Sequence, residues 1–498
     1  PHIITPIQNE PYAVKLSSQY EGRASGFFGA PASFAAMMLL IGFGALSAGF
    51  CKRFNTIIRV ILIYFGLMMI GGILLSVSRG ALILVVVGFL AIPVIVRAKW
   101  KTRLLFWALT IALLGAVGAM LMSFSDTFSG RVESAIEDRG EVTRPVMWTA
   151  AWEQFLDAPI LGNGAGAYEY RFEEFRPEGF NRTPAHAHND YLETLADQGI
   201  VGFALFWVPV AIILMMTARE WSRLPDRVKI DVLDERKRRP LRMPTQKMLL
   251  GSIGLAIFLF CAHLLLEFHL RVPGLLMFFF VLLACLAKVC NIRSIKIPRS
   301  IPTVLVLFVL GLAISIALPM WMTPRFIAHS YAQEGERALM KFTRNVDQYK
   351  QDQEFFDHMT SMLRQATERK PGNAVAWNNL SNAVAAQSLL SPAQSRVFGQ
   401  EAEQYARRAI QLNPNSPQAW INLGNALKLQ TRMIEAGKAY QKATEVGPNN
   451  AETWHFYAAY LDMLATTRGQ ALTAVDRALE LDPGREDSQR LRKKILVP

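Results

Sequence analysis

The sequence predicts an all-α protein, in which a polytopic membrane helix bundle is followed by a soluble α-solenoid of short helical repeats. Apolar residues make up 51% of the 498-residue chain and gather in long uncharged runs in its first two thirds. Charged residues make up only 19%, against about 25% in soluble domains. The last third instead repeats a pattern of Ala, Pro and Trp with a 34-residue step. Together these patterns exclude a purely soluble protein, a disordered chain and a secreted disulfide scaffold.

Eight apolar stretches are long enough, or nearly long enough, to cross a bilayer. A bilayer core needs about 20 apolar residues in a helix, and lipid offers no partner to free backbone groups. The predicted spans are residues 33–50, 60–78, 80–96, 104–122, 200–218, 248–266, 272–287 and 302–322. The third and the seventh are short, but each follows its neighbour through a tight hairpin. We therefore expect a membrane domain over residues 33–322 with about eight transmembrane helices.

Lys and Arg residues gather in every second connection between these spans, and this pattern orients the bundle. Connection 219–247 has ten basic and five acidic side chains, whereas loop 123–199 has six Arg, no Lys and fourteen acidic residues. We expect loop 219–247 in the cytoplasm, and loop 123–199, segment 1–32 and everything after residue 322 on the other side. Much of the net charge of +13 is thus a topology signal, and nucleic acid is not an expected partner.

The first residue is Pro1 rather than Met, and no signal peptide follows it. With segment 1–32 outside, a chain that starts in the cytoplasm needs an odd number of further spans, so we expect the sequence to continue upstream. The four cysteines lie in or beside apolar runs without metal-ligand spacing. We interpret them as structural thiols.

The C-terminal part carries internal repeats. Ala and Pro recur five positions apart, and a Trp follows three of the prolines by six positions: Ala366/Pro371/Trp377, Ala409/Pro414/Trp420, Ala443/Pro448/Trp454 and Ala478/Pro483. This pattern resembles the tetratricopeptide repeat, in which helix pairs stack into a curved solenoid. The resemblance implies a repeat domain over residues 371–498, with an insertion near 387–398 and a capping helix over 484–496. Residues 323–370 form the expected helical connector.

The predicted external loop holds the most informative motif. His186, His188 and Asn189 stand in the run His-Ala-His-Asn-Asp-Tyr-Leu-Glu, and nine residues separate Asn189 from Gly199-Ile-Val-Gly202. This spacing resembles the signature of the bacterial O-antigen ligase superfamily, which includes O-antigen ligases, protein O-oligosaccharyltransferases and polysaccharide polymerases. Further pieces fit in the same order: Arg23-Ala-Ser-Gly-Phe-Phe-Gly29, Ser76-Val-Ser-Arg-Gly80, Arg144 with Trp148, and Leu161-Gly-Asn-Gly-Ala-Gly166.

The resemblance implies an inverting, metal-independent glycosyltransferase without a cofactor, in the inner (cytoplasmic) membrane of a bacterium. It would move a glycan from undecaprenyl pyrophosphate to a hydroxyl of a glycan, lipid or protein acceptor. The loop and the repeat domain would then be periplasmic, and the repeats would hold an acceptor, a polymer or a protein partner. The sequence leaves open a repeat-unit polymerase, a protein O-oligosaccharyltransferase and a non-catalytic scaffold that assembles an envelope complex through its repeats.

Particular residues suit this chemistry. Histidine is the usual general base, and His188 is therefore the candidate catalytic residue, with His186 as its neighbour. A pyrophosphate leaving group favours the permanent, forked charge of arginine, so Arg79 and Arg144 are candidates for binding it. The motif adds Asn189 as a substrate-binding candidate.

Ionisable residues also stand in and after span six. His263 and Glu267 are four positions apart and are expected on one helix face, with Arg271 at the external mouth. We expect these three residues to bind donor or acceptor, although an interhelical pair is the alternative. The glycines of run 161–166 would either offer amides to a phosphate or form a plain turn. No metal site is expected among the acidic residues of the loop, Asp126, Glu133, Glu137 and Asp138.

Overall fold

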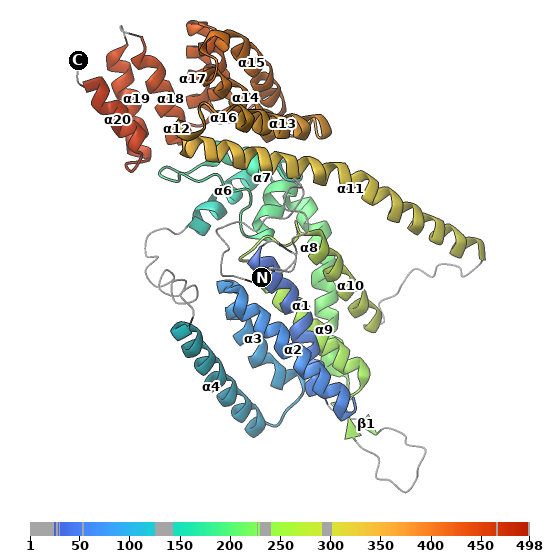
Figure 1. Ribbon diagram of the computed structural model, residues 1–498. Helices are drawn as coiled ribbons and strands as arrows, with labels where there is room; N and C mark the ends of the chain where they lie inside the picture. The colour runs from blue at the N-terminus through green and yellow to red at the C-terminus, as the bar shows by residue number, and fades with distance from the viewer. Residues whose placement is uncertain are drawn as a thin grey trace. The chain divides into compact units, whose positions relative to one another are not determined.

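The computed structural model describes residues 24–25, 28, 30–51, 54–124, 143–226, 228–229, 241–290, 301–464 and 467–496. These residues are almost wholly helical, which confirms the predicted all-α class (Figure 1). Two short strands, β1 (Val228–Lys229) and β2 (Leu241–Arg242), pair antiparallel in the loop predicted to be cytoplasmic. Arg23, the four acidic residues named above and most of segment 1–32 lie outside the described residues.

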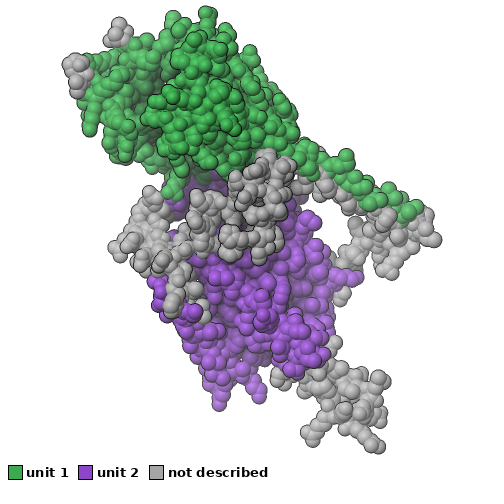
Figure 2. All heavy atoms as spheres, in the orientation of Figure 1, with its two compact units in different colours: residues 1–14, 169–184, 296–498 green, residues 15–168, 185–295 purple. Residues whose placement is uncertain are grey.

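The chain divides into two compact units (Figure 2). Residues 15–168 and 185–295 belong to unit 2, whereas residues 169–184 and 296–498 belong to unit 1. The division therefore falls before residue 322, the predicted end of the membrane domain. A piece of the predicted external loop, residues 169–184, also folds with unit 1. The predicted domain boundaries themselves stay a prediction.

Unit 2 consists of apolar helices and a few polar ones. Its helices are α1 (Pro31–Phe50), α2 (Thr56–Ser76), α3 (Arg79–Ile95), α4 (Trp100–Phe124), α6 (Thr143–Asp157), α8 (Asp190–Arg223), α9 (Thr245–His263) and α10 (Pro273–Val289), and α7 (Ala167–Arg171) begins at its edge. By length and composition, α1, α2, α4, α8 and α9 are able to cross a membrane, and α3 and α10 are shorter apolar helices. These seven helices contain most of the first seven predicted spans.

Helices α1 and α9 form the centre of unit 2. Over half of each apolar stretch is buried, whereas only 17% of the apolar stretches of α2 and α8 is buried, as in helices facing lipid. Phe43 of α1 packs edge-on against Phe89 of α3, with 5.6 Å between the ring centroids. A Cβ atom at Gly88 would lie 2.3 Å from the Phe43 ring, so α3 approaches α1 closely only because this position is glycine.

Unit 1 is a series of helix pairs that follows one long helix. Its helices are α11 (Ile301–Arg344), α12 (Val346–Tyr349), α13 (Gln353–Arg369), α14 (Ala374–Ala386), α15 (Ser395–Leu412), α16 (Pro417–Leu429), α17 (Met433–Val446), α18 (Ala451–Asp462), α19 (Arg468–Leu481) and α20 (Glu486–Leu496). The predicted eighth span, 302–322, is the first part of α11. Two 3₁₀ turns, η4 (Gln387–Leu389) and η5 (Pro392–Gln394), occupy the predicted insertion, and α20 is the predicted capping helix.

One hydrogen bond explains the Pro–Trp spacing of the repeats. The indole nitrogen of each Trp donates to the carbonyl of the Pro six positions earlier: Trp377 to Pro371 (2.9 Å), Trp420 to Pro414 (2.9 Å) and Trp454 to Pro448 (2.8 Å). In the capping helix the side chain of Gln489 makes the equivalent bond to Pro483 (2.7 Å). The bond ties the turn before each helix pair to the first helix of that pair, so the turns of successive repeats have the same conformation.

Candidate active site

A break in helix α8 organises the candidate site. Asn189 caps the helix, because its side-chain oxygen accepts hydrogen bonds from the amides of Tyr191 (3.0 Å) and Leu192 (3.1 Å). Gly199 interrupts the helix with φ 62° and ψ −171°, a conformation that almost only glycine adopts. The nine residues between Asn189 and Gly199 are thus one short helix between a cap and a break. The structure in this way explains the spacing of the motif.

The glycine-rich turn packs against this break. The amides of Gly164 and Gly166 donate to the backbone oxygen (2.8 Å) and to Oδ2 (2.7 Å) of Asp197, and the amide of Gly162 donates to Ala158. All three glycines have positive φ. Because carbonyl and carboxylate groups of the protein already accept hydrogen bonds from these amides, the hypothesis that they cradle a phosphate is wrong. The alternative of a plain turn is confirmed, and the turn satisfies backbone groups that the break leaves open.

Substitution of Gly199 tests this arrangement. A Cβ atom there would lie 2.4 Å from the carbonyl oxygen of Ile160, and the backbone strain alone costs about 1–3 kcal/mol. We expect Gly199→Ala to lower the yield and melting temperature of the detergent-solubilised protein. Gly274→Ala is the matched control, because no atom lies within 4 Å of the added Cβ. Equal melting temperatures of the two variants would contradict the proposed strain.

Glu267 joins two of the predicted residues. Its Oε1 accepts a hydrogen bond from Nη2 of Arg144 (2.7 Å), and its Oε2 lies 3.2 Å from Nδ1 of His188. Arg144 is in the first turn of α6, His188 precedes the cap of α8, and Glu267 follows α9. The Glu267 side chain is 10% exposed, whereas those of Arg144 and His188 are about one-third exposed. The buried carboxylate therefore holds two side chains that still reach solvent.

The electrostatics of this cluster keep Glu267 ionised. Burial raises its pKa, but the hydrogen bond from His188 and the positive charge of Arg144 outweigh burial, so the pKa of Glu267 lies below its ordinary value. An ionised carboxylate only accepts hydrogen bonds, and Nδ1 of His188 is therefore the donor. In the neutral imidazole, Nε2 then carries the lone pair and is able to take a proton.

The carboxylate of Glu193 contacts two more of the predicted site residues, His186 and Arg271. Oε1 of Glu193 lies 3.0 Å from Nδ1 of His186 and 3.0 Å from Nη2 of Arg271, which also bonds to Asp197. Burial lowers the pKa of Arg271, but the charges of Glu193 and Asp197 raise it by more, and the guanidinium stays charged. His186 and Arg271 are thus in contact with one buried acid.

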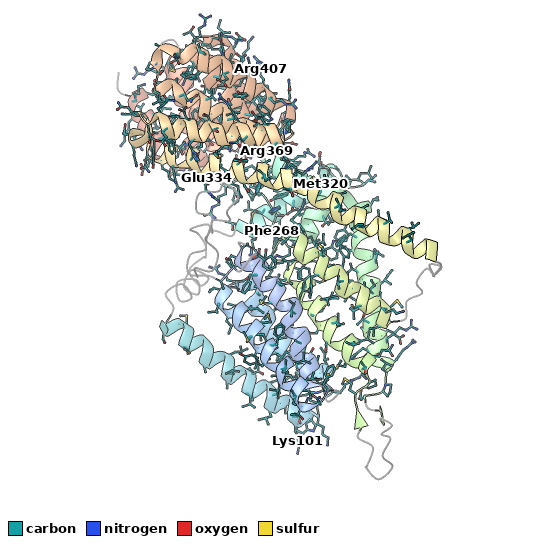
Figure 3. All side chains as sticks on the ribbon, turned by 45° about the vertical axis from the view of Figure 1, so that its right-hand side comes forward. Lys101, Phe268, Met320, Glu334, Arg369 and Arg407 are labelled. Carbon is teal, nitrogen blue, oxygen red and sulfur yellow. The ribbon has the colours of Figure 1, made fainter. Side chains whose placement is uncertain are left out.

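The ring of Phe268, the residue labelled in Figure 3, contacts both histidines. Its ring stacks on His186 at 4.2 Å between centroids and meets His188 edge-on at 4.8 Å. A cavity of about 230 Å³ lies on the side of Glu193. It is lined by Asp190, Glu193, Thr194, Gln198, Phe206, Leu270, Arg271 and Leu276. The site therefore has two parts, one around Glu267 and one around Glu193.

His263 is buried beside a second histidine. Its Nδ1 lies 3.1 Å from Nε2 of His269, and burial together with the neighbouring His263 and His188 holds the pKa of His269 well below its ordinary value. Helix α9 ends at His263, so Glu267 lies in the following connection. The expectation that the two share a helix face is therefore wrong, because the chain turns after Leu264.

Arg79 lies near the connection that follows α9, as the contacts of the next residue, Gly80, show. It is exposed and begins α3, and a Cβ atom at Gly80 would lie 3.3 Å from the His263 ring and 3.2 Å from Leu266. In the structure, Glu267 contacts Arg144 and His188 directly. Glu193 in turn contacts His186 and Arg271. Asn189 acts as a helix cap, and Arg79 and His263 lie next to this assembly.

Sequence reasoning missed Glu193, Asp197 and Phe268. Asp190, Glu193 and Asp197 are spaced i, i+3 and i+7, so they share one face of the short helix. This spacing could have indicated from the sequence that the three carboxylates lie together. The position of Phe268 in the turn after α9 had no such signal. Among the described residues, no group of three or more His, Cys, Asp and Glu side chains is arranged to hold a metal ion.

Comparison with known proteins identifies two regions. Residues 63–207 match the family described as O-antigen ligase, and residues 417–450 match the tetratricopeptide repeat. The first match includes Arg79, Arg144, His186, His188 and Asn189, and ends before His263, Glu267 and Arg271. No curated protein matches the chain.

Two solved structures to which the chain is similar are tetratricopeptide-repeat proteins. One is a thermophilic tetratricopeptide-repeat protein of Thermus thermophilus, 18% identical, with 36% of this chain and 99% of that chain covered and a TM-score of 0.27. Another is YrrB, described as a tetratricopeptide-repeat protein with an unusual peptide-binding site, 18% identical, with 30% and 97% covered and a TM-score of 0.19. The apolar helices and the two family matches together indicate a multi-pass membrane protein that is similar to the O-antigen ligase family over residues 63–207 and to the tetratricopeptide repeat over residues 417–450.

Proposed function

We propose that this protein is an inverting glycan transferase of the bacterial inner membrane. It moves an oligo- or polysaccharide from undecaprenyl pyrophosphate to an acceptor hydroxyl on the periplasmic face. The observation that carries the proposal is the Arg144–Glu267–His188 cluster, where one buried carboxylate holds a permanent cation and a base side by side. The O-antigen ligase family match over the region that contains Arg144 and His188 supports the glycan-transfer chemistry.

His188 acts as the general base in this reaction. Its Nε2 takes the proton of the acceptor hydroxyl while the oxygen attacks the anomeric carbon of the donor sugar. The bond between that carbon and the phosphate oxygen breaks, and undecaprenyl pyrophosphate leaves with the electron pair. Attack from the face opposite the leaving group inverts the anomeric configuration. Glu267 orients the imidazole and stabilises the imidazolium that forms.

The arginines bind the pyrophosphate. Arg144 uses Nη2 to bond to Glu267, and a guanidinium has five N–H donors, so further donors reach the phosphate oxygens. Arg79 at the start of α3 adds charge at the same connection, where the positive end of a helix also favours an anion. Charge develops on the pyrophosphate as it leaves, and fixed cations lower the energy of that transition state.

The cavity beside Glu193 is suited to the acceptor. The side chains of Thr194 and Gln198 are able to hydrogen-bond to sugar hydroxyls, and Phe206 and Leu276 supply apolar walls. Arg271 and His186 fix Glu193 from either side. Asn189 and His263 support this part through the helix cap and the buried histidine pair. The proposed mechanism requires no metal or cofactor.

The glycans of a deletion strain test the proposal. The strain is complemented with wild type or empty vector, and lipid-linked intermediates, lipid A-core and periplasmic glycoproteins are analysed together. Accumulation of long carrier-linked polymer with loss of the lipid A ladder supports a ligase. Loss of protein glycans instead indicates a protein O-oligosaccharyltransferase, and single repeat units alone indicate a polymerase. Identical profiles in both strains would contradict any transfer function and favour the scaffold.

A further inference from the structure

The segment 169–184 belongs to the repeat unit, although it is part of the loop that leads to the histidines. Residues on either side of it, Tyr168 and Ala185, belong to unit 2 (Figure 2). The chain therefore leaves unit 2, contributes sixteen residues to unit 1 and returns three residues before His188. The repeats thus hold a piece of the same loop that carries the proposed base.

The segment has a compact structure of its own. Arg176 is 4% exposed and donates hydrogen bonds to Glu173, to the carbonyls of Phe180 (2.6 Å) and Arg182 (2.8 Å), and to the hydroxyl of Thr183 (2.7 Å). One buried guanidinium in this way ties both halves of the segment together. A charge held by this many partners gives the segment one defined conformation.

Successive repeats contact this segment through equivalent turns. Asn415 and Asn449 each follow the proline of their repeat, 34 residues apart. The Asn449 side chain donates to the carbonyl of Arg176 (2.8 Å), and that of Asn415 donates to the carboxylate of Glu174. Asn450 adds a bond to Glu173 (3.3 Å). The repeat period thus places donors of the same kind along the segment.

Helix α19, the second helix of the repeat that begins at Pro448, adds a charged contact. Nη2 of Arg477 lies 2.7 Å from Oε1 of Glu178, and the side chain of Asn181 donates to the carbonyl of Leu481 (3.5 Å). Side-chain amides and one guanidinium on the repeats therefore meet carboxylates and carbonyls on the segment. We name the donors Asn415, Asn449, Asn450 and Arg477 the turn edge.

Both ends of the segment are close in sequence to groups of the candidate site. The amide of Tyr168 donates to Oδ1 of Asp197 (3.0 Å), which is the partner of Arg271. At the other end, the amide of Ala187 donates to Oε2 of Glu193 (2.9 Å). Fixing the segment also reduces the conformational freedom of the short stretch between Pro184 and His188, because one end of that stretch is then held in place.

We propose that the turn edge of the repeats clamps residues 169–184 and thereby positions His188 for transfer. The turn edge consists of positioning residues, and its occupant is a segment of this same chain. The inference rests on the proposed function only for the role of His188. The clamp itself is a property of unit 1 and is testable without activity.

A triple variant, Asn415→Asp/Asn449→Asp/Arg477→Glu, tests the clamp in the full-length protein. The two Asp side chains keep the shape of Asn, and all three changes place a negative charge against a carboxylate or carbonyl of the segment. We expect faster trypsin cleavage after Arg171 and Arg182, and faster hydrogen exchange of residues 185–189. We also expect kcat to fall about tenfold or more with KM for the donor nearly unchanged, because misplaced catalytic groups slow the chemical step.

Two controls separate the clamp from general damage. Arg490→Glu makes the same charge change in α20, where the partner Glu486 lies in the same helix, and should match wild type in every measurement. Glu178→Arg alone should loosen the segment, and Glu178→Arg with Arg477→Glu should restore it by reversing the ion pair. Such rescue is not expected from a variant that merely unfolds the repeats.

The outcomes are distinguishable. Unchanged trypsin cleavage in the triple variant would show that the turn edge does not hold the segment, and the inference would be overturned. Faster cleavage with wild-type exchange at residues 185–189 and wild-type kcat would overturn the positioning role. If the wild-type protein transfers no glycan, the proposed function fails, but cleavage and exchange still decide the clamp.

Discussion

Replacing His188 by alanine is expected to lower the rate of glycan transfer by about 10²–10⁴-fold, the usual contribution of a general base. The imidazole is held by Glu267 at 3.2 Å, and its side chain is one-third exposed, so the base is both fixed and accessible to an acceptor. The rate would be measured with purified protein in detergent and a lipid-linked donor. Abundance of the variant in the membrane should equal that of wild type.

Two variants control for changes other than loss of the base. His188 has φ 50°, a left-handed conformation that asparagine tolerates better than alanine does. His188→Asn should therefore be as inactive as His188→Ala, although its backbone is less strained. His186→Ala removes the neighbouring ring that stacks on Phe268 and should cost less activity. Wild-type transfer by His188→Asn at normal abundance would exclude His188 as the base.

Much of the fold is predictable from the sequence because its signals are local. The apolar runs of α1, α2 and α9 and the Pro–Trp spacing of the repeats each act within one element or one turn. The start of α8 at Asp190 was likewise predictable from the preceding Asn189. The break at Gly199 was less predictable, because a glycine permits a positive φ but does not require one. The contacts with Ile160 and Asp197 fix it there.

The candidate site was less predictable than the fold, because its contacts join residues that are far apart in the sequence. His188, Arg144 and Glu267 were identified by residue type, but their common contact joins positions up to 123 residues apart. Nothing in the sequence pairs Arg271 with Glu193 and Asp197, since that choice depends on how the connection after α9 folds back on α8. The place of residues 169–184 with the repeats is also invisible in the sequence, because the segment has no apolar period of its own.

Replacing Glu267 by glutamine should reduce transfer by at least 10²-fold, because a single side chain holds both the base and the cation. The amide keeps one acceptor oxygen and gains a donor, so it no longer accepts from both Arg144 and His188. Loss of the negative charge also removes the stabilisation of the imidazolium. Glu267→Asp keeps the charge on a shorter side chain and should retain more activity than Glu267→Gln. Equal activity of the two variants would show that the charge is unimportant.

The pH dependence of stability gives an independent measurement. Because the folded pKa of Glu267 lies below its ordinary value near 4.5, the carboxylate adds stability that is fully present above that value. This contribution is lost as pH falls from the ordinary pKa through the lower folded pKa. The melting temperature of Glu267→Gln should therefore lie below that of wild type by a constant amount from about pH 6 upward, and the difference should shrink under acid. A difference that grows on acidification would mean that folding favours the protonated carboxyl, and the ionised Arg144–Glu267–His188 cluster would be excluded.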